Sequence, residues 1–147
     1  MIRSILATSA LMMLCATPLV ARSTAANSAI VAAVADTHRT GANRLRDKYR
    51  HPVETLNFFG MKPQQTVVEF LPSSGWYTEI LAPLLNQRGH YIALAGSTPK
   101  AQASLTKLLT GGATRYAGAT SASIDTATGK SNVSPGSVDV VLTFRNV

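Results

Sequence analysis

The chain of 147 residues is long enough for one domain, and its 14 Lys and Arg against 7 Asp and Glu give a formal net charge of +7. Hydrophobic residues make up 46% and charged residues 14%, which excludes a disordered, charge-driven polypeptide. The single Cys15 excludes an intramolecular disulfide scaffold, and no uninterrupted apolar run reaches the ~18 residues of a transmembrane helix.

The N-terminus has the order of a secretory signal peptide. Arg3 gives a positive start, residues 5–16 form an apolar core, and small residues follow that end at Ala21 or Ala26. An N-terminal core helix of a cytosolic protein is the alternative. We expect residues 1–26 to be the signal, and the mature chain to be exported to the periplasm or secreted.

A short leader and a basic helix are expected next. Residues 27–35 are rich in alanine and valine, and we expect them to be a flexible leader to a domain over residues 36–147. Asp36 and Thr37 can cap a helix that runs through residue 50. Five basic residues of this helix lie within twelve positions: Arg39, Arg44, Arg46, Lys48 and Arg50. The pattern favours a solvated helix face over a patch that binds nucleic acid or an anionic membrane.

A second helix and the first strand come after this segment. His51 precedes Pro52, a combination that interrupts a helix and suits proline to the first position of a new one. Gly60 then ends that helix. Residues 66–71 are β-branched and nearly continuously apolar, which is typical of a strand buried on both faces. Residues 72–75 form a tight connection.

Helix and strand signals alternate in the rest of the chain. We expect helices at 76–87 and 100–109, clear strands at 90–95 and 138–144, and a weak strand near 116–121. Connections of helix length predict an α/β fold with a parallel sheet, in which the strand at 66–71 lies between the two other clear strands. Because the sheet has few strands for this class, the domain is expected to be incomplete at its C-terminus.

The turn after the first strand is the best candidate for a ligand site. Ligands of open α/β sheets bind beyond the carboxyl ends of the strands, where Glu69 and small turn residues lie. Neither a dinucleotide fingerprint nor a phosphate-loop motif occurs. The three histidines are far apart, which disfavours a zinc site, and Ser73 and Ser74 lack the preceding glycine of a nucleophile elbow. An ordinary turn with Trp76 as a core anchor is the alternative.

A resemblance to a known family is carried by residues 54–63, 66–69 and 75–83, the last reading GWYTEILAP, and by residues 144–147. These segments are similar to a group of exported, predicted class I S-adenosylmethionine-dependent methyltransferases. The resemblance implies a three-layer Rossmann-like methyltransferase fold with seven strands, of which this chain holds the N-terminal part. It also implies transfer of a methyl group to an unknown acceptor.

The same resemblance implies S-adenosylmethionine as the cofactor, bound over the first two strands. Its methionine end would lie against Glu69 and the following turn, and Asn146 would lie near the adenine or the substrate. The implied cofactor-binding residues are Glu69, Pro72, Ser73, Ser74, Gly75, Trp76, Tyr77 and Asn146. Methyl transfer depends on proximity and in-line alignment, so the lack of an obvious acid–base pair is compatible with it.

Two features support a second hypothesis, a non-catalytic exported remnant without a cofactor site. Ser73 and Ser74 stand where the family has glycines, and a side chain at positive φ is strained by about 1–2 kcal/mol. The second strand ends at residues 94–97 without the acid that would bind the ribose hydroxyls, and Asp125 is the nearest later acid.

Overall fold

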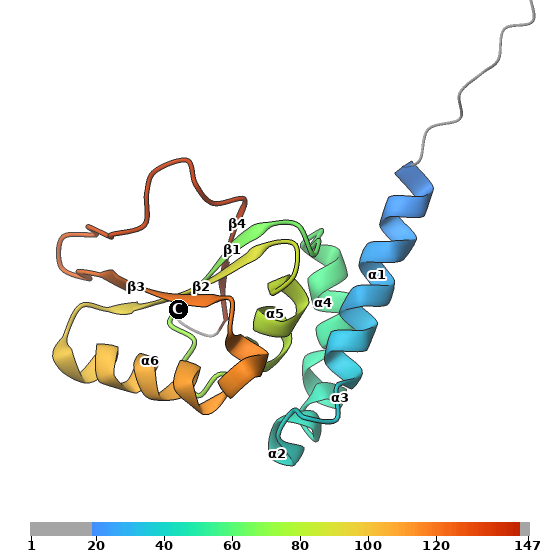
Figure 1. Cartoon of the computed structure of the whole chain (residues 1–147), viewed down its shortest axis with the longest axis horizontal. Coiled ribbons are helices and arrows are strands. Elements are labelled where there is room, and N and C mark those ends of the chain that lie inside the picture. The colour runs from blue at the N-terminus through green and yellow to red at the C-terminus, as the bar shows by residue number, and fades with distance from the viewer. Residues whose placement is uncertain (1–18, 145–147) are drawn as a thin grey trace, which may run out of the picture.

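The computed structural model describes residues 19–144, in an α/β arrangement with one parallel sheet (Figure 1). The strands are β1 (Thr66–Phe70), β2 (His90–Gly96), β3 (Ala119–Ile124) and β4 (Val140–Thr143). The helices are α1 (Leu19–Ala35), α2 (Gly41–Arg44), α3 (Asp47–Arg50), α4 (Pro52–Phe58), α5 (Thr78–Leu85), α6 (Pro99–Gly111) and the 3-10 helix η1 (Ala113–Tyr116). The first 18 residues of the expected signal peptide, and Asn146, lie outside the described residues.

The sheet has the order β3-β2-β1-β4, and β1 pairs in parallel with both β2 and β4, which confirms the expected central strand. Val67 and Val68 of β1 point to opposite faces and are both buried, because the continuous apolar run suits a strand covered on both sides. The weak strand is β3, and it begins at Ala119 because η1 takes up Tyr116. Such a sheet is compatible with a Rossmann-like fold.

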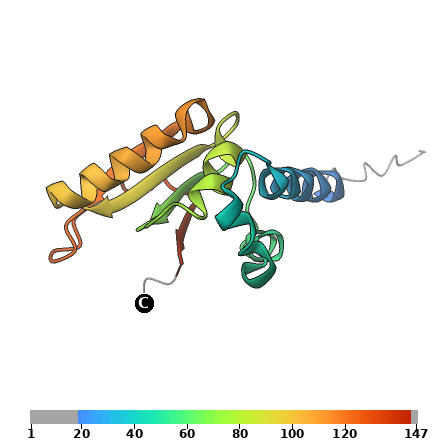
Figure 2. The same cartoon turned by 90° about the horizontal axis from the view of Figure 1, so that it is seen from below.

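The two faces of the sheet are covered by different kinds of structure. On one face, α1, α5 and α6 pack over the larger core, to which β1, β2 and β4 contribute Val67, Tyr91 and Leu142. Figure 2 shows α6 along this face and the N-terminal helices gathered beside α5. The other face carries a smaller cluster around Val68 and Leu94, which is covered by the extended connection between β3 and β4.

Residues 27–35 belong to a packed helix, α1, and are not the expected flexible leader. Ile30 has no exposed surface, and Ala33 and Val34 pack against the same core. Small alanine side chains let α1 approach α4 and α5 closely, and Figure 1 shows α1 running beside α4. Within residues 19–144, no helix combines the length and apolar character needed to cross a bilayer.

The single helix expected over residues 36–50 is two short helices, α2 and α3, joined through Leu45 and Arg46. Asp36 does not cap it, because its carboxylate accepts from the His38 N–H at 2.8 Å and pairs with Arg115 at 3.0 Å. The expected interruption at residue 51 is confirmed. His51 lies in the left-handed region, with φ of 43°, and α4 begins at the next residue, a proline.

Candidate functional site

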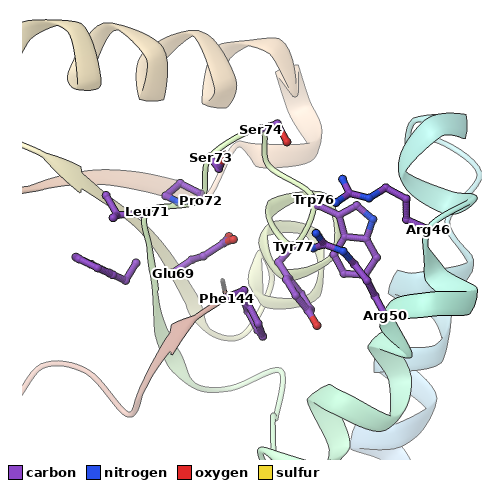
Figure 3. Close-up of a pocket in the computed structure, with 11 residues that line it drawn as sticks. Arg46, Arg50, Glu69, Leu71, Pro72, Ser73, Ser74, Trp76, Tyr77 and Phe144 are labelled. Atoms are coloured by element: carbon purple, nitrogen blue, oxygen red, sulfur yellow. The ribbon is translucent and has the colours of Figure 1, made fainter. Parts of the chain in front are cut away.

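A cavity of about 300 Å³ opens at the carboxyl ends of β1 and β4 (Figure 3). Its walls come from the end of β1 and the following turn, from the residue after β4, and from the α2–α3 segment. The lining residues are Arg46, Arg50, Glu69, Phe70, Leu71, Pro72, Ser73, Ser74, Trp76, Tyr77 and Phe144. The structure therefore brings together six of the residues expected from the sequence. Gly75 lies in the same turn but does not line the cavity.

The turn between β1 and α5 alternates through the left-handed region of backbone space. Leu71 has a φ of 53°, Ser73 of 55° and Gly75 of 83°. Of the two serines in the turn, only Ser73 therefore carries the strain of a side chain at positive φ. At Gly75 the backbone conformation favours glycine, and a Cβ there would also displace the tip of the Leu108 side chain of α6.

Glu69 is the buried acid at the end of β1, with 3% of its surface exposed. Its Oε2 accepts hydrogen bonds from Tyr91 Oη at 2.6 Å and from Thr78 Oγ1 at 3.0 Å. Burial raises the pKa of the Glu69 carboxyl to about 7, and the two hydroxyl groups oppose that rise. Glu69 therefore gains or loses its proton near neutral pH. These two partners are side chains of α5 and β2, and neither belongs to the turn backbone.

Three aromatic rings form an apolar wall of the cavity. Tyr77 stacks on Phe144, with ring centroids 3.5 Å apart and an angle of 15° between the planes. Trp76 meets the Tyr77 ring edge-on at 4.6 Å, and its Nε1 donates to the Asn43 carbonyl oxygen at 2.8 Å. Trp76 is thus both the expected core anchor and the residue that joins the turn to α2.

Two arginines of the α2–α3 segment form a cationic wall (Figure 3). The Arg50 guanidinium lies 4.7 Å from the centroid of the Trp76 ring, within range of a cation–π interaction. Within residues 19–144, the Arg46 guanidinium makes no hydrogen bond and no ion pair with another residue. Arg44 and Lys48 are exposed, as expected for a solvated helix face, whereas Arg46 and Arg50 are partly exposed and line the cavity.

Arg39 departs furthest from that expectation, because only 2% of it is exposed. Its guanidinium donates to both carboxylate oxygens of Asp47, at 2.7 and 2.8 Å, and to the Val34 carbonyl oxygen at 2.7 Å. Glu79 of α5 lies 3.9 Å from Arg39 Nε and accepts from the Thr40 N–H. This clamp fixes α3, and with it the arginine wall, against α1 and α5.

The end of β2 offers no acid to a ligand. Gly96 O accepts from Gln102 Nε2 of α6 at 2.9 Å, so the last carbonyl of the strand is already paired. Asp125 does not substitute for the missing acid, because its carboxylate accepts from Ala127 N and Thr128 Oγ1 within its own turn. Among the described residues, the side of the site near β2 therefore offers no free carboxylate to the hydroxyls of a ribose.

Comparisons of the chain with models of known protein families, with curated proteins and with solved structures find no match. In the part of the chain from residue 19 to residue 144, no group of three or more His, Cys, Asp or Glu side chains is placed to hold a metal ion. The chemistry of the site must therefore be read from its own residues, which are one buried carboxyl, two guanidinium groups and an aromatic wall.

Proposed function

We propose that this chain is an exported domain of Rossmann-like methyltransferase type. It binds S-adenosylmethionine in the cavity and transfers the methyl group to an unknown acceptor. The observation that carries the proposal is the position of Glu69, a buried carboxyl at the carboxyl end of the central strand and on the wall of a cavity. Ligands of open α/β sheets bind at this edge, and a carboxylate there selects a cationic group such as the ammonium of methionine.

The residues of the cavity fit the methionine end of this cofactor. Glu69 would accept from the ammonium group, and the turn at Ser73 and Ser74 would let the ligand approach the backbone. When bound, S-adenosylmethionine supplies an electrophilic methyl group on a sulfonium sulfur. The aromatic wall of Trp76, Tyr77 and Phe144 would exclude water from that centre and restrict how an acceptor approaches it.

The residues do not fit the ribose end as well, and this favours a second candidate function, a remnant without cofactor binding. The end of β2 has no carboxylate, and the strained Ser73 stands where a glycine would be relaxed. The two candidates differ in one measurable property, which is whether the folded chain binds S-adenosylmethionine.

Calorimetric titration of the full chain with S-adenosylmethionine tests the proposal, with circular dichroism to show that each sample is folded. We expect saturable binding by the natural chain and a loss of about tenfold or more in Glu69→Gln, because that variant lacks a charged acceptor. Glu54→Gln, which changes an exposed acid of α4, is the matched control and should bind normally. A folded natural chain that does not bind at about 1 mM cofactor establishes the remnant.

Export is a separate part of the proposal, supported by the positive start and apolar core at the N-terminus. Mass spectrometry of the protein recovered outside the cytoplasm should find a new N-terminus between Arg22 and Asn27. An intact Met1 on protein from the soluble cytosol would contradict export without bearing on cofactor binding.

A further inference from the structure

The cavity has a positively charged wall that the position of Glu69 does not explain. Its lining contains two guanidinium groups, Arg46 and Arg50, and one carboxyl, Glu69. A sulfonium cofactor adds another positive charge to the same space, and like charges a few Å apart repel strongly in a partly desolvated site. The arrangement becomes favourable when an anion enters as well.

The backbone segment that carries the two arginines is held beside the cavity by the fold. The Arg39 pair with Asp47 fixes α3, and the bond from Trp76 to the Asn43 carbonyl fixes α2, so both ends of the segment are anchored. By contrast, the neighbouring Arg44 and Lys48 are exposed and do not line the cavity. In Figure 3 the arginines reach in from the helical wall, across from the turn at Ser73 and Ser74 that the cofactor would occupy.

The shape and chemistry of the cavity indicate the kind of anion. A guanidinium is a planar donor that matches carboxylate geometry, and it stacks well on aromatic rings. Trp76, Tyr77 and Phe144 offer flat apolar surface beside the arginines, and about 300 Å³ is the lower end of the range for small-molecule sites. We propose that Arg46 and Arg50 form the acceptor subsite and bind the carboxylate of an aromatic acid. The role of the bound acid as methyl acceptor rests on the proposed function. Binding of the anion to the two arginines can be measured without cofactor.

Benzoate is a suitable probe, and the chain contains its own reporter. Trp76 is the single tryptophan of the sequence and lines the cavity, so its fluorescence, excited at the red edge of indole absorption, reports binding there. We expect a saturable change with benzoate, and binding about tenfold or more weaker for benzamide, which has the same shape without the charge. Equal binding of benzoate and benzamide would overturn the proposal, and so would the absence of a response to benzoate by the folded chain.

Two substitutions that each remove one positive charge distinguish binding at the subsite from attraction by the net positive charge of the chain. Arg46→Gln should weaken benzoate about tenfold. Arg44→Gln should leave it unchanged, because Arg44 is exposed and outside the cavity. Equal loss in the two variants would assign the effect to net charge and overturn the subsite.

Titration of benzoate in the presence of saturating S-adenosylmethionine completes the test. Benzoate should bind at least as tightly, because the two ligands carry opposite charges and occupy opposite walls. Displacement of benzoate by the cofactor would place the cofactor's own carboxylate on the arginines and overturn the acceptor assignment. Benzoate binding by a chain that ignores the cofactor would instead retain the anion site and refute methyl transfer.

Discussion

The carboxyl ends of β1 and β2 lie next to each other in the same sheet, but they are built in different ways. After β1 the chain turns through left-handed residues and opens a cavity, with Glu69 buried on its wall. After β2, helix α6 begins at Pro99, and its Gln102 side chain pairs with the last carbonyl of the strand, that of Gly96. Strand ends at the same edge of a sheet thus become ligand sites or closed corners according to the residues that follow them.

This difference matters for a cofactor that must lie across both strands. The end of β1 has an ionisable group, an apolar wall and free volume, whereas the end of β2 has no carboxylate and its last carbonyl is paired within the protein. A ligand that needs only the first end is served by the structure as it stands. A ligand that also needs polar contacts at the end of β2 would require a substitution at that strand end.

The largest expected effect comes from the buried carboxyl at the end of β1. The pKa of Glu69 is about 7 in the folded chain, raised from its ordinary value of 4.5, so the folded state holds this proton more tightly than the unfolded state. Its contribution to stability is fully present below pH 4.5 and is lost as pH rises through 7. The free energy of unfolding should therefore fall by about 3 kcal/mol as this proton is released.

Urea unfolding followed from about pH 5 to about pH 8 measures this change. In the Glu69→Gln variant the free energy of unfolding should fall much less over this pH range, because the glutamine has no proton to release. A decline of the same size in the variant would assign the pH dependence to other groups and leave Glu69 without its predicted role.

The next largest effect concerns the closed end of β2. A Cβ at Gly96 would meet only Ala101 Cβ, at 3.8 Å, which is an ordinary contact, so a side chain is tolerated there. We expect Gly96→Asp to strengthen S-adenosylmethionine binding about tenfold, because the new carboxylate can accept from the ribose hydroxyls. Gly96→Asn has nearly the same shape without the charge and is the control. No gain in the aspartate variant over the asparagine variant would mean that the ribose does not reach β2.

The smallest effect is expected in the turn after β1. Ser73→Gly should raise the free energy of unfolding by about 1 kcal/mol, because Ser73 adopts positive φ with a side chain. Ser74→Gly should lower it by about 0.5–1 kcal/mol, because Ser74 is outside the positive-φ region and glycine only adds entropy to the unfolded chain. Urea unfolding midpoints compare the two. The same sign of change in both variants would remove strain at Ser73 as the explanation.

The strands could be predicted from the sequence because their signals are local. Residues 66–71 are continuously apolar, and the parallel order follows from connections of helix length. The α1 helix was missed because an alanine-rich stretch after an apolar N-terminus is also typical of a leader. Only the packing of α1 against α4 and α5, which buries Ile30, distinguishes the two, and that packing is not local.

The candidate site was predicted on one wall and missed on the other. Glu69 and the turn were found because strand, acid and small residues are consecutive in the sequence. The arginine wall was missed because the burial of Arg39 depends on Asp47, eight residues away, and on Glu79 in another element. Five basic residues with one acid among them were the available signal, and such a run more often belongs to a solvated face.

The buried Arg39 makes the N-terminal layer a cooperative unit of local unfolding. Helices α2 and α3 have four residues each, too few to persist by their own hydrogen bonds. Releasing Asp47 would take from the buried guanidinium its two short bonds to a carboxylate, which is costly, so α3 does not fray alone, and the bond from Trp76 to Asn43 ties α2 to the same layer. Amide hydrogens of α2 and α3 should therefore exchange with solvent at the same rate as those at the end of α1, when the whole layer opens at once.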